Sequence, residues 1–324
     1  MREEPLLYSD SLLTSLVEAH LGSPVGVPQF QRIATGKFNT SFFVQGWERE
    51  LVLRIAPPED EGFVFYERGM MAQEPEIHRI IRSRTSTPVA EILAYDDSRR
   101  LIDRDFLIME RLPGRPLTEA GSVSQDFNDR VLYQVGRHLR QIHEITSDAY
   151  GYLGAHKPMS PQRDWPSAFR IMWNLMIEDI RATEHYSYSE AEYMRRLLDD
   201  NLDHFQRPVE SCLLHMDIWH QNILVDEQGN VTGLIDLDRA LWGDPEIEFA
   251  VLDYCGISEL EFWQGYGEER DWSASASVRQ MFYLLYEVQK YIVIHHWRHG
   301  DDVSAARYKA QVMNLARQLP GGAT

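Results

Sequence analysis

The chain is poor in cysteine, in basic residues and in long apolar runs. Only two cysteines, Cys212 and Cys255, occur among 324 residues, which is too few for a disulfide framework and fits a reducing cytoplasm. Neither has a partner at the spacing of a zinc site, so both are expected to be core thiols. No stretch reaches the roughly 18 apolar residues of a membrane span, and the charged start lacks the apolar run of a signal peptide. The sequence therefore predicts a soluble, cytoplasmic protein.

Acidic residues outnumber lysine and arginine, 50 against 32, which gives a formal net charge of −18. Residues 1–112 carry 13 basic and 18 acidic side chains, and the rest of the chain carries 19 and 32. Such a surface argues against nucleic acid as a partner, because phosphate binding needs a basic face. It would attract a cationic small molecule, although an acidic surface also simply keeps a protein in solution.

The most informative stretch contains two short apolar segments, residues 223–225 and 231–235, joined by a turn-rich link. This composition predicts a β-hairpin. Asn222 precedes the first strand and Asp236 follows the second, so antiparallel pairing brings both side chains to one end of the hairpin. Asp217 lies in the loop that leads to the same end. We expect these three oxygen donors to converge, and oxygen is the ligand atom that Mg²⁺ prefers.

The residues around the hairpin form the pattern His-x-Asp-x-x-x-x-Asn from His215 onward, followed by an apolar strand that ends in Asp. The pattern resembles the catalytic and metal-binding loops of the protein-kinase-like fold. The Gly-Asp-Pro at residues 243–245 resembles more particularly the aminoglycoside phosphotransferase family. The resemblance implies a two-lobed α+β fold with a small antiparallel-sheet N-lobe and a larger, mainly helical C-lobe. A Pro-Gly break places the boundary between residues 1–112 and 113–324.

This resemblance implies a kinase that uses Mg²⁺ and transfers a phosphoryl group from ATP or GTP to a hydroxyl group of a small molecule. Asp217 would be the catalytic base or would orient the acceptor hydroxyl. His215, the other residue assigned to catalysis, would act mainly by orienting that loop. Asn222 and Asp236 would bind the metal ion.

The N-lobe would bind the nucleotide through an antiparallel meander predicted within residues 30–55. Its first loop would cover the phosphates. Arg54 stands where kinases carry Lys and would either pair with phosphate or face solvent. Glu74, or alternatively Glu76, would fix Arg54 from a helix that begins near residue 73. The residues predicted to contact the nucleotide are Gly36, Asn39, Thr40, Ser41, Arg54, Glu74, Glu110 and Leu112.

Beyond the boundary, apolar residues recur at helical spacing over residues 127–145. In the family, helices of this lobe form an acidic, aromatic-rimmed wall for a cationic acceptor. Asp238 and Trp219 are the candidate acceptor contacts, but Asp238 could equally support the metal site, and Trp219 could be a packing residue. Further helices are predicted over residues 167–182, 189–204, 246–254, 275–298 and 303–319.

Three features separate the chain from protein kinases. Trp219 stands where Ser/Thr kinases carry Lys, the metal loop reads Asp236-Leu237-Asp238, and no Ala-Pro-Glu follows. The favoured function is antibiotic resistance by phosphorylation of an aminoglycoside-type substrate, because the larger lobe is acidic. Residues 150–154 and the Arg54 strand also somewhat resemble hygromycin B phosphotransferases. The alternatives are a kinase for choline, homoserine, methylthioribose or fructosamine, a non-catalytic nucleotide-binding regulator, and a kinase with a protein acceptor.

Overall fold

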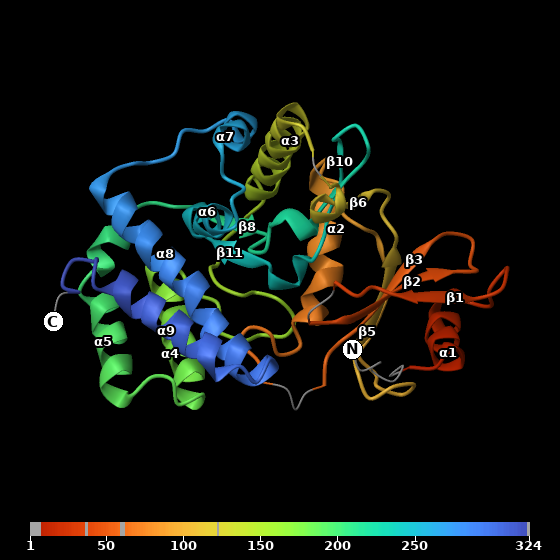
Figure 1. Ribbon diagram of the computed structural model, residues 1–324, viewed down its shortest axis with the longest axis horizontal. Helices are drawn as coiled ribbons and strands as arrows, with labels where there is room; N and C mark the ends of the chain where they lie inside the picture. The colour runs from red at the N-terminus through yellow and green to blue at the C-terminus, as the bar shows by residue number, and fades with distance from the viewer. Residues whose placement is uncertain (1–7, 36–37, 59–61, 122, 323–324) are drawn as a thin grey trace.

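The computed structural model describes residues 8–35, 38–58, 62–121 and 123–322. An antiparallel sheet forms one lobe, on the right in Figure 1, and a mainly helical lobe lies beside it on the left. This arrangement matches the predicted α+β class with two lobes of unequal size. The chain crosses from one lobe to the other near residues 111–114, after the last strand of the sheet.

The sheet of the smaller lobe pairs its five strands antiparallel in the order β1-β2-β3-β5-β4. Helix α1 (Asp10–Leu21) packs on it through Leu13, Leu16 and Val17, which are buried. Ser9 caps this helix because its hydroxyl accepts a hydrogen bond from the N–H of Leu12. The strands are β1 (Gln29–Arg32), β2 (Thr40–Gln45), β3 (Leu51–Ile55), β4 (Ile92–Asp96) and β5 (Phe106–Glu110).

Helix α2 (Glu74–Arg84) lies at the centre of the molecule, between the sheet and the larger lobe (Figure 1). It follows a 3-10 turn and carries a proline in its first turn, where the missing N–H costs no hydrogen bond. Ile77 and Ile81 are buried against the larger lobe. Glu74, the first residue of the helix, is also buried, so the helix carries a carboxylate into the interior beside β3.

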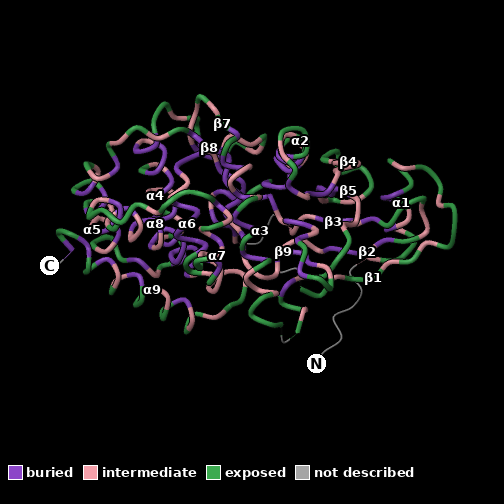
Figure 2. Tube along the Cα trace, turned by 90° about the horizontal axis from the view of Figure 1, so that it is seen from above, coloured by how far each residue is buried: buried purple, intermediate pink, exposed green. Residues whose placement is uncertain are grey.

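The larger lobe is built around helix α8, whose residues Phe282, Leu285, Tyr286 and Val288 are fully buried. Figure 2 shows buried positions gathered where α4, α6 and α8 meet. Each such side chain contributes roughly 1.5–3 kcal/mol of burial free energy. The helices are α3 (Gln125–His143), α4 (Trp165–Ala182), α5 (Tyr188–Asp199), α6 (Pro245–Tyr254), α7 (Leu260–Tyr266), α8 (Ala274–Val293) and α9 (Asp302–Ala316).

The predicted hairpin is present as β9 (Ile223–Val225) and β10 (Val231–Leu234), which pair antiparallel. The N–H of Ile235 donates to the carbonyl oxygen of Asn222 at 3.0 Å, so the pairing continues to the residues that flank the strands. The short strand β6 (Arg115–Pro116) joins β9 at its other edge. A third sheet of β7 (Thr146–Ser147), β8 (Ser211–Leu214) and β11 (Leu241–Gly243) lies beside the hairpin.

The helix predictions differ from the structure at several ends and in one omission; the helix predicted over residues 303–319, for example, ends at Ala316. The helix predicted over residues 189–204 ends at Asp199, and the one predicted over 275–298 ends at Val293 and continues as a π-turn, Ile294–Arg298. Helix α7 was not predicted. Its Gly265 lies against the backbone of α3, and Gly136 of α3 lies against the backbone of α7, so a β-carbon at either glycine would prevent this close crossing. Within the described ranges, none of these helices has the length and apolar character to cross a bilayer.

Candidate active site

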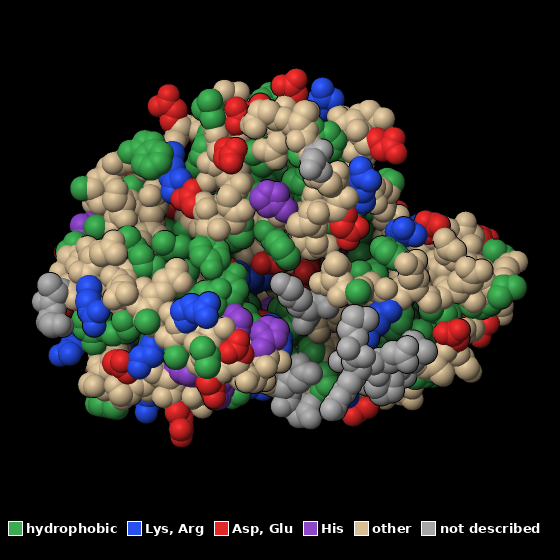
Figure 3. Space-filling view, in the orientation of Figure 1, with side chains coloured by type: hydrophobic (Ala, Val, Ile, Leu, Met, Phe, Trp, Pro, Cys, Tyr) green, Lys and Arg blue, Asp and Glu red, His purple; other side chains and the backbone are tan. Residues whose placement is uncertain are grey.

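A cleft of about 540 Å³ lies between the two lobes. Figure 3 shows a hollow at the centre of this face, with acidic and basic side chains deep inside it. Among the predicted site residues, Thr40, Glu74 and His215 do not line the cleft, and Gly36 lies outside the described residues. Those that line it are Asn39, Ser41, Arg54, Glu110, Leu112, Asp217, Trp219, Asn222, Asp236 and Asp238.

The loop after β8 places Asp217 beside Asn222. The amide Nδ2 of Asn222 donates to Oδ2 of Asp217 at 2.8 Å and to its carbonyl oxygen at 2.9 Å. Because the amide nitrogen is used in this way, the amide oxygen of Asn222 is the atom left for a cation. Desolvation raises the pKa of Asp217, against the opposing effect of Lys290. His215 is fully buried, and its Nδ1 accepts from the N–H of Asp217 at 3.3 Å.

Asp236 begins the metal loop in the left-handed conformation, with φ of 68°. Asp tolerates this region better than most residues because its short polar side chain can bond locally. The following residues form a 3-10 turn, Leu237–Arg239, that buries Asp238. The side chain of Asp236 keeps 39% of its surface exposed. One carboxylate of the loop is therefore open to the cleft, and the other lies behind it.

Arg54 of β3 joins these elements through its guanidinium group. It donates to Glu74 of α2 at 2.6 Å, to Asp236 at 2.7 Å and to Asp238 at 3.1 Å. Burial disfavours the charged guanidinium, yet the three carboxylates hold the pKa of Arg54 above its ordinary value. Burial also raises the pKa of Glu74 to about 7, although Arg54 opposes this rise. Three carboxylates around one guanidinium leave a surplus of negative charge beside the cleft.

Glu248 of α6 belongs to the site, although the sequence analysis did not name it among the candidate residues. Its Oε2 accepts from Nε2 of His143 at 2.8 Å and from the N–H of His215 at 3.1 Å, and its Oε1 accepts from the N–H of Met216 at 2.6 Å. Met216 has a left-handed backbone, with φ of 68°, which a methionine adopts only when its surroundings impose it. Glu248 therefore holds the loop that carries Asp217.

Replacing Glu248 with glutamine should destabilise the protein by about 1.5–3 kcal/mol at neutral pH, because an amide cannot accept all three hydrogen bonds. Burial alone would raise the pKa of Glu248, but the hydrogen bond from His143 and its charge hold it below the ordinary 4.5. The stabilisation is therefore present above pH 4.5 and is lost as the pH falls through the lower folded-state pKa. Urea unfolding at several pH values should show the wild type and the variant converging in acid.

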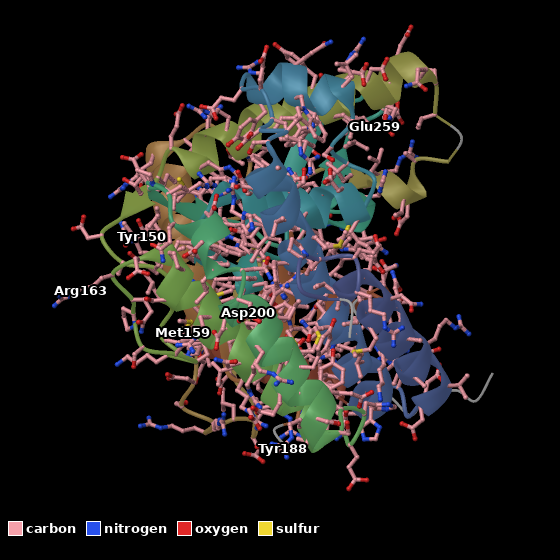
Figure 4. The ribbon with its side chains drawn as sticks, turned by 90° about the vertical axis from the view of Figure 1, so that its left-hand side faces the viewer. Tyr150, Met159, Arg163, Tyr188, Asp200 and Glu259 are labelled. Atoms are coloured by element: carbon pink, nitrogen blue, oxygen red, sulfur yellow. The ribbon has the colours of Figure 1, made fainter. Side chains whose placement is uncertain are left out.

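The matched control is Glu259→Gln, at an exposed glutamate on the outer face of the lobe (Figure 4). Its free energy of unfolding should equal that of the wild type at every pH. A Glu248→Gln protein with wild-type stability at pH 7 would contradict the bracing role.

The opposite end of the cleft, beneath the sheet, is apolar. Glu110 uses its carboxylate within the protein, because Oε1 accepts from Arg82 at 2.9 Å and from the N–H of Glu91 at 2.8 Å. Within the part of the chain that the structure describes, the N–H of Leu112 has no hydrogen-bond acceptor. A planar base between apolar walls could supply one. The apolar side chains here are Val52, Ala90, Met109, Leu224 and Ile235.

The loop before β2 reaches the metal loop. Nδ2 of Asn39 donates to Oδ2 of Asp238 at 3.3 Å, so this predicted nucleotide contact is made here to a carboxylate. Gln73 also donates through its side chain to the carbonyl oxygen of Asp238. Sequence reasoning did not single out Gln73, which lies one residue before Glu74. Asp238 is thus held from two sides, and desolvation and Asp236 raise its pKa well above the ordinary value.

The remaining wall of the cleft comes from α6, α8 and the π-turn. Glu287 forms ion pairs with Arg239, at 2.8 Å, and with Lys290. Arg298 pairs with Glu67 at 2.7 Å. The rings of Tyr254 and Tyr291 lie 5.8 Å apart beside these pairs. This wall is therefore aromatic, and its two carboxylates are fully offset by three basic side chains.

The acids of α4 and α5, which the resemblance made candidates for the acceptor wall, lie elsewhere. Of the described residues that line the cleft, none belongs to either helix. Asp199 pairs with Arg170 at 2.7 Å, and Glu190 pairs with Lys309. Figure 4 shows Tyr188 and Asp200, at the two ends of α5, on the outer side of the lobe. The excess acidity of the larger lobe is thus partly a property of its outer surface.

Comparison with known proteins identifies the family. Residues 29–274 match the phosphotransferase enzyme family, which covers most of the chain. The chain belongs to that family. It is therefore a small-molecule phosphotransferase, as the residues around the hairpin predict, and the matched range takes in the sheet and the loops that carry Asp217 and Asp236.

Relatives of this phosphotransferase include proteins named as probable ketoamine kinases. One from Vibrio vulnificus is 27% identical over 227 residues, covering 66% of this chain and 71% of the relative. One from Escherichia coli K12 is 25% identical over 260 residues, covering 76% of each. The names of these relatives support the alternative of a metabolite kinase better than the favoured interpretation as a resistance kinase.

Solved structures share the fold. The aminoglycoside phosphotransferase APH(4)-Ia, in a ternary complex with AMP-PNP and hygromycin B, has a TM-score of 0.67 at 19% identity, covering 96% of this chain and 99% of that one. A Thermobifida fusca protein named as a fructosamine-3-kinase has a TM-score of 0.66 at 16% identity, covering 94% and 100%. The two scores are almost equal, so overall shape does not discriminate between the acceptor classes.

Proposed function

We propose that this phosphotransferase transfers the γ-phosphoryl group of ATP to a hydroxyl group of a small polyhydroxylated metabolite of the ketoamine class. The observation that carries the proposal is that the described carboxylates of this acceptor wall, Glu287 and Glu67, are already offset by basic side chains. Arg239 and Lys290 offset Glu287, and Arg298 offsets Glu67. A polycationic aminoglycoside would need a surplus of carboxylates there. A ketoamine, with many hydroxyl groups and one amino group, needs hydrogen bonds and an aromatic surface, which Tyr254 and Tyr291 supply.

Asp217 is the proposed base, since its carboxylate lies in the cleft beside Asn222 and would accept the proton of the attacking hydroxyl. Asn222 and Asp236 are the proposed ligands of Mg²⁺, with Asp238 behind them. Hard oxygen donors and a local surplus of negative charge fit a small divalent cation. When bound, the ion would neutralise charge on the phosphate groups. His215 and Glu248 hold the loop so that Asp217 keeps its direction.

The nucleotide would lie under the sheet, with its base between Val52 and Leu224 and its edge toward Leu112. The unpaired N–H of Leu112 supports ATP as the donor, because adenine N1 accepts a hydrogen bond, whereas guanine N1 carries a hydrogen. Arg54 would then exchange one or more of its three carboxylate partners for the phosphate groups. This role in phosphate binding is part of the proposal.

The test is a comparison of kcat/KM across acceptors, measured as ADP release with Mg²⁺. A ketoamine such as a fructosylated amine should be turned over at least about 100-fold more efficiently than any aminoglycoside, which corresponds to roughly 2.7 kcal/mol of transition-state binding. The panel should include choline and simple sugars, so that charge and hydroxyl content vary separately.

Salt provides an independent readout, because binding of a polycation by unpaired carboxylates weakens steeply as ionic strength rises. The KM for the preferred ketoamine should change little between low and physiological salt. An aminoglycoside with the highest kcat/KM, or a strongly salt-dependent KM, would overturn the acceptor assignment. Tight ATP binding without turnover of any small molecule would favour the regulatory alternative.

A further inference from the structure

A second cluster of metal-ligating side chains lies outside the cleft, where three segments distant in sequence meet. His185 belongs to the turn between α4 and α5, His296 to the π-turn, and Asp302 is the first residue of α9. One ligand atom from each lies within 4.8 Å of the other two, and no other such group of at least three occurs among the described residues. Figure 3 shows histidine side chains gathered with acidic ones below the hollow.

Both imidazole rings converge on one carboxylate oxygen. Nε2 of His185 lies 3.4 Å from Oδ1 of Asp302, and Nδ1 of His296 lies 2.5 Å from the same atom. The two rings stand nearly perpendicular, at 84°, with centroids 5.3 Å apart. The nitrogens therefore approach a common point from different directions, which is how imidazole ligands surround a metal ion.

The spacing fits a four-coordinate ion with only a small rearrangement. Zn²⁺ lies about 2.0–2.2 Å from nitrogen and oxygen ligands, so tetrahedral ligand atoms stand roughly 3.3–3.5 Å from one another. The separation between His185 and Asp302 already has this value at 3.4 Å. Asp302 and His296 must move apart, and the side chain of Asp302, 71% exposed, has room to do so; the ligand atoms of the three residues already lie within 4.8 Å of one another.

We propose that His185, His296 and Asp302 bind one transition-metal ion of the Zn²⁺ class, with water at the position open to solvent. Imidazole nitrogen suits Zn²⁺, Ni²⁺ and Cu²⁺, whereas Mg²⁺ takes oxygen ligands. The ion would therefore be chemically distinct from the one proposed for phosphoryl transfer. Two of the three proposed ligands are imidazole nitrogens, whereas the residues proposed to bind Mg²⁺ at the cleft offer oxygen atoms.

The site would stabilise one wall of the cleft. His296 lies in the same π-turn as Ile294 and Arg298, and both of these line the cleft. An ion that links the turn to α9 and to the α4–α5 connection would hold Arg298 in place against Glu67. Because the ion binds only the assembled site, it would also raise the melting temperature by mass action.

The test is calorimetric titration of the full chain with ZnCl₂, after removal of metals with a chelator and in the presence of excess MgCl₂ to occupy the oxygen site. The wild type should bind one Zn²⁺ per chain and should melt at a higher temperature when Zn²⁺ is present. Asp302→Asn and His185→Ala should each lower the affinity at least about 10-fold and remove the shift in melting temperature. Because the side chain of Asp302 is exposed, the Asp302→Asn variant should fold even if the His185→Ala variant does not.

Two control variants separate this site from other histidines. His20→Ala removes a histidine with a single carboxylate partner, Asp96 at 2.9 Å, and His295→Ala removes the neighbour of His296 in the π-turn. Both should bind Zn²⁺ as the wild type does. The proposal is overturned if the wild type binds no Zn²⁺, if Asp302→Asn binds it equally well, or if His295→Ala is the variant that loses it. In those cases the cluster is only a hydrogen-bonded tie between the three segments.

Discussion

Asp217→Asn should lower kcat by about 10²–10⁴-fold, which is the usual contribution of a positioned general base. The amide keeps the shape of the side chain but cannot accept the proton of the acceptor hydroxyl. ATP binding should be nearly unchanged, because Asp217 lies toward the acceptor and the nucleotide is expected under the sheet. The measurement is ADP release under saturating ketoamine, together with the affinity for ATP by calorimetry.

The pH dependence of kcat provides a second test of the role of Asp217. Desolvation raises the pKa of Asp217 above its ordinary 3.8, and a base must be deprotonated to act. The kcat of the wild type should therefore increase with pH through an apparent pKa above that value, and this rise should be absent in Asp217→Asn. Asp200→Asn, at an exposed acid on the outer side of the lobe (Figure 4), is the matched control and should leave kcat unchanged. Substrate-dependent turnover at the wild-type rate in Asp217→Asn would remove Asp217 from its role.

Arg54→Met should destabilise the protein by about 3–5 kcal/mol, because it leaves buried carboxylates without their counter-charge. Glu74 has no exposed side-chain surface, and Asp238 has only 8%. That loss is a large part of the free energy of unfolding of a typical domain, which is roughly 5–15 kcal/mol. Urea unfolding measures it directly. Arg49→Met, which breaks an Arg–Glu pair exposed by 55% and 45%, is the control and should cost less than about 1 kcal/mol.

A double-mutant cycle with Glu74→Gln identifies the source of the loss. Removing the buried charge should recover part of the stability of Arg54→Met, so the two effects should not add. The pH dependence has a definite sign. The pKa of Glu74 is raised in the folded protein to about 7, so the stability from its protonated form is present below about pH 4.5 and lost as the pH rises through 7. Without Arg54 this rise is larger, so Arg54→Met continues to lose stability where the wild type no longer does, and its deficit should grow as the pH rises above about 7. Simple additivity would show that Arg54 and Glu74 do not depend on each other.

The hairpin and the long helices were predictable because their causes are local. Two apolar segments joined by a turn within residues 222–236 are enough to bring Asn222 beside the residue before Asp236. Antiparallel strand pairing has a fixed geometry, so the residues that flank the two strands meet. Helix α3 repeats its apolar residues every three or four positions and buries that face. The family resemblance rests on the stretch from His215 to Pro245 that contains the hairpin, and the match over residues 29–274 agrees with it.

The acceptor wall was not predictable in the same way. Counting acids indicated a cationic substrate, but a count does not say which carboxylates face the cleft and which already have a partner. Asp199 and Glu190 are paired on other surfaces. Glu287 faces the cleft, yet Arg239 and Lys290 offset its charge. Helix α7 was missed because its seven residues are too few for a periodic pattern to stand out.

The sequence by itself determined most of the elements, the family and the order of the candidate residues along the chain, because propensity, periodicity and turn chemistry act over a few neighbouring residues. Only the tertiary structure decided that Arg54 also contacts Asp236 and Asp238, that Glu248 holds the loop of Asp217, and that His185 meets Asp302. These contacts join segments tens to hundreds of residues apart. They exist because burial leaves a charged or polar group stable only where a distant partner satisfies it.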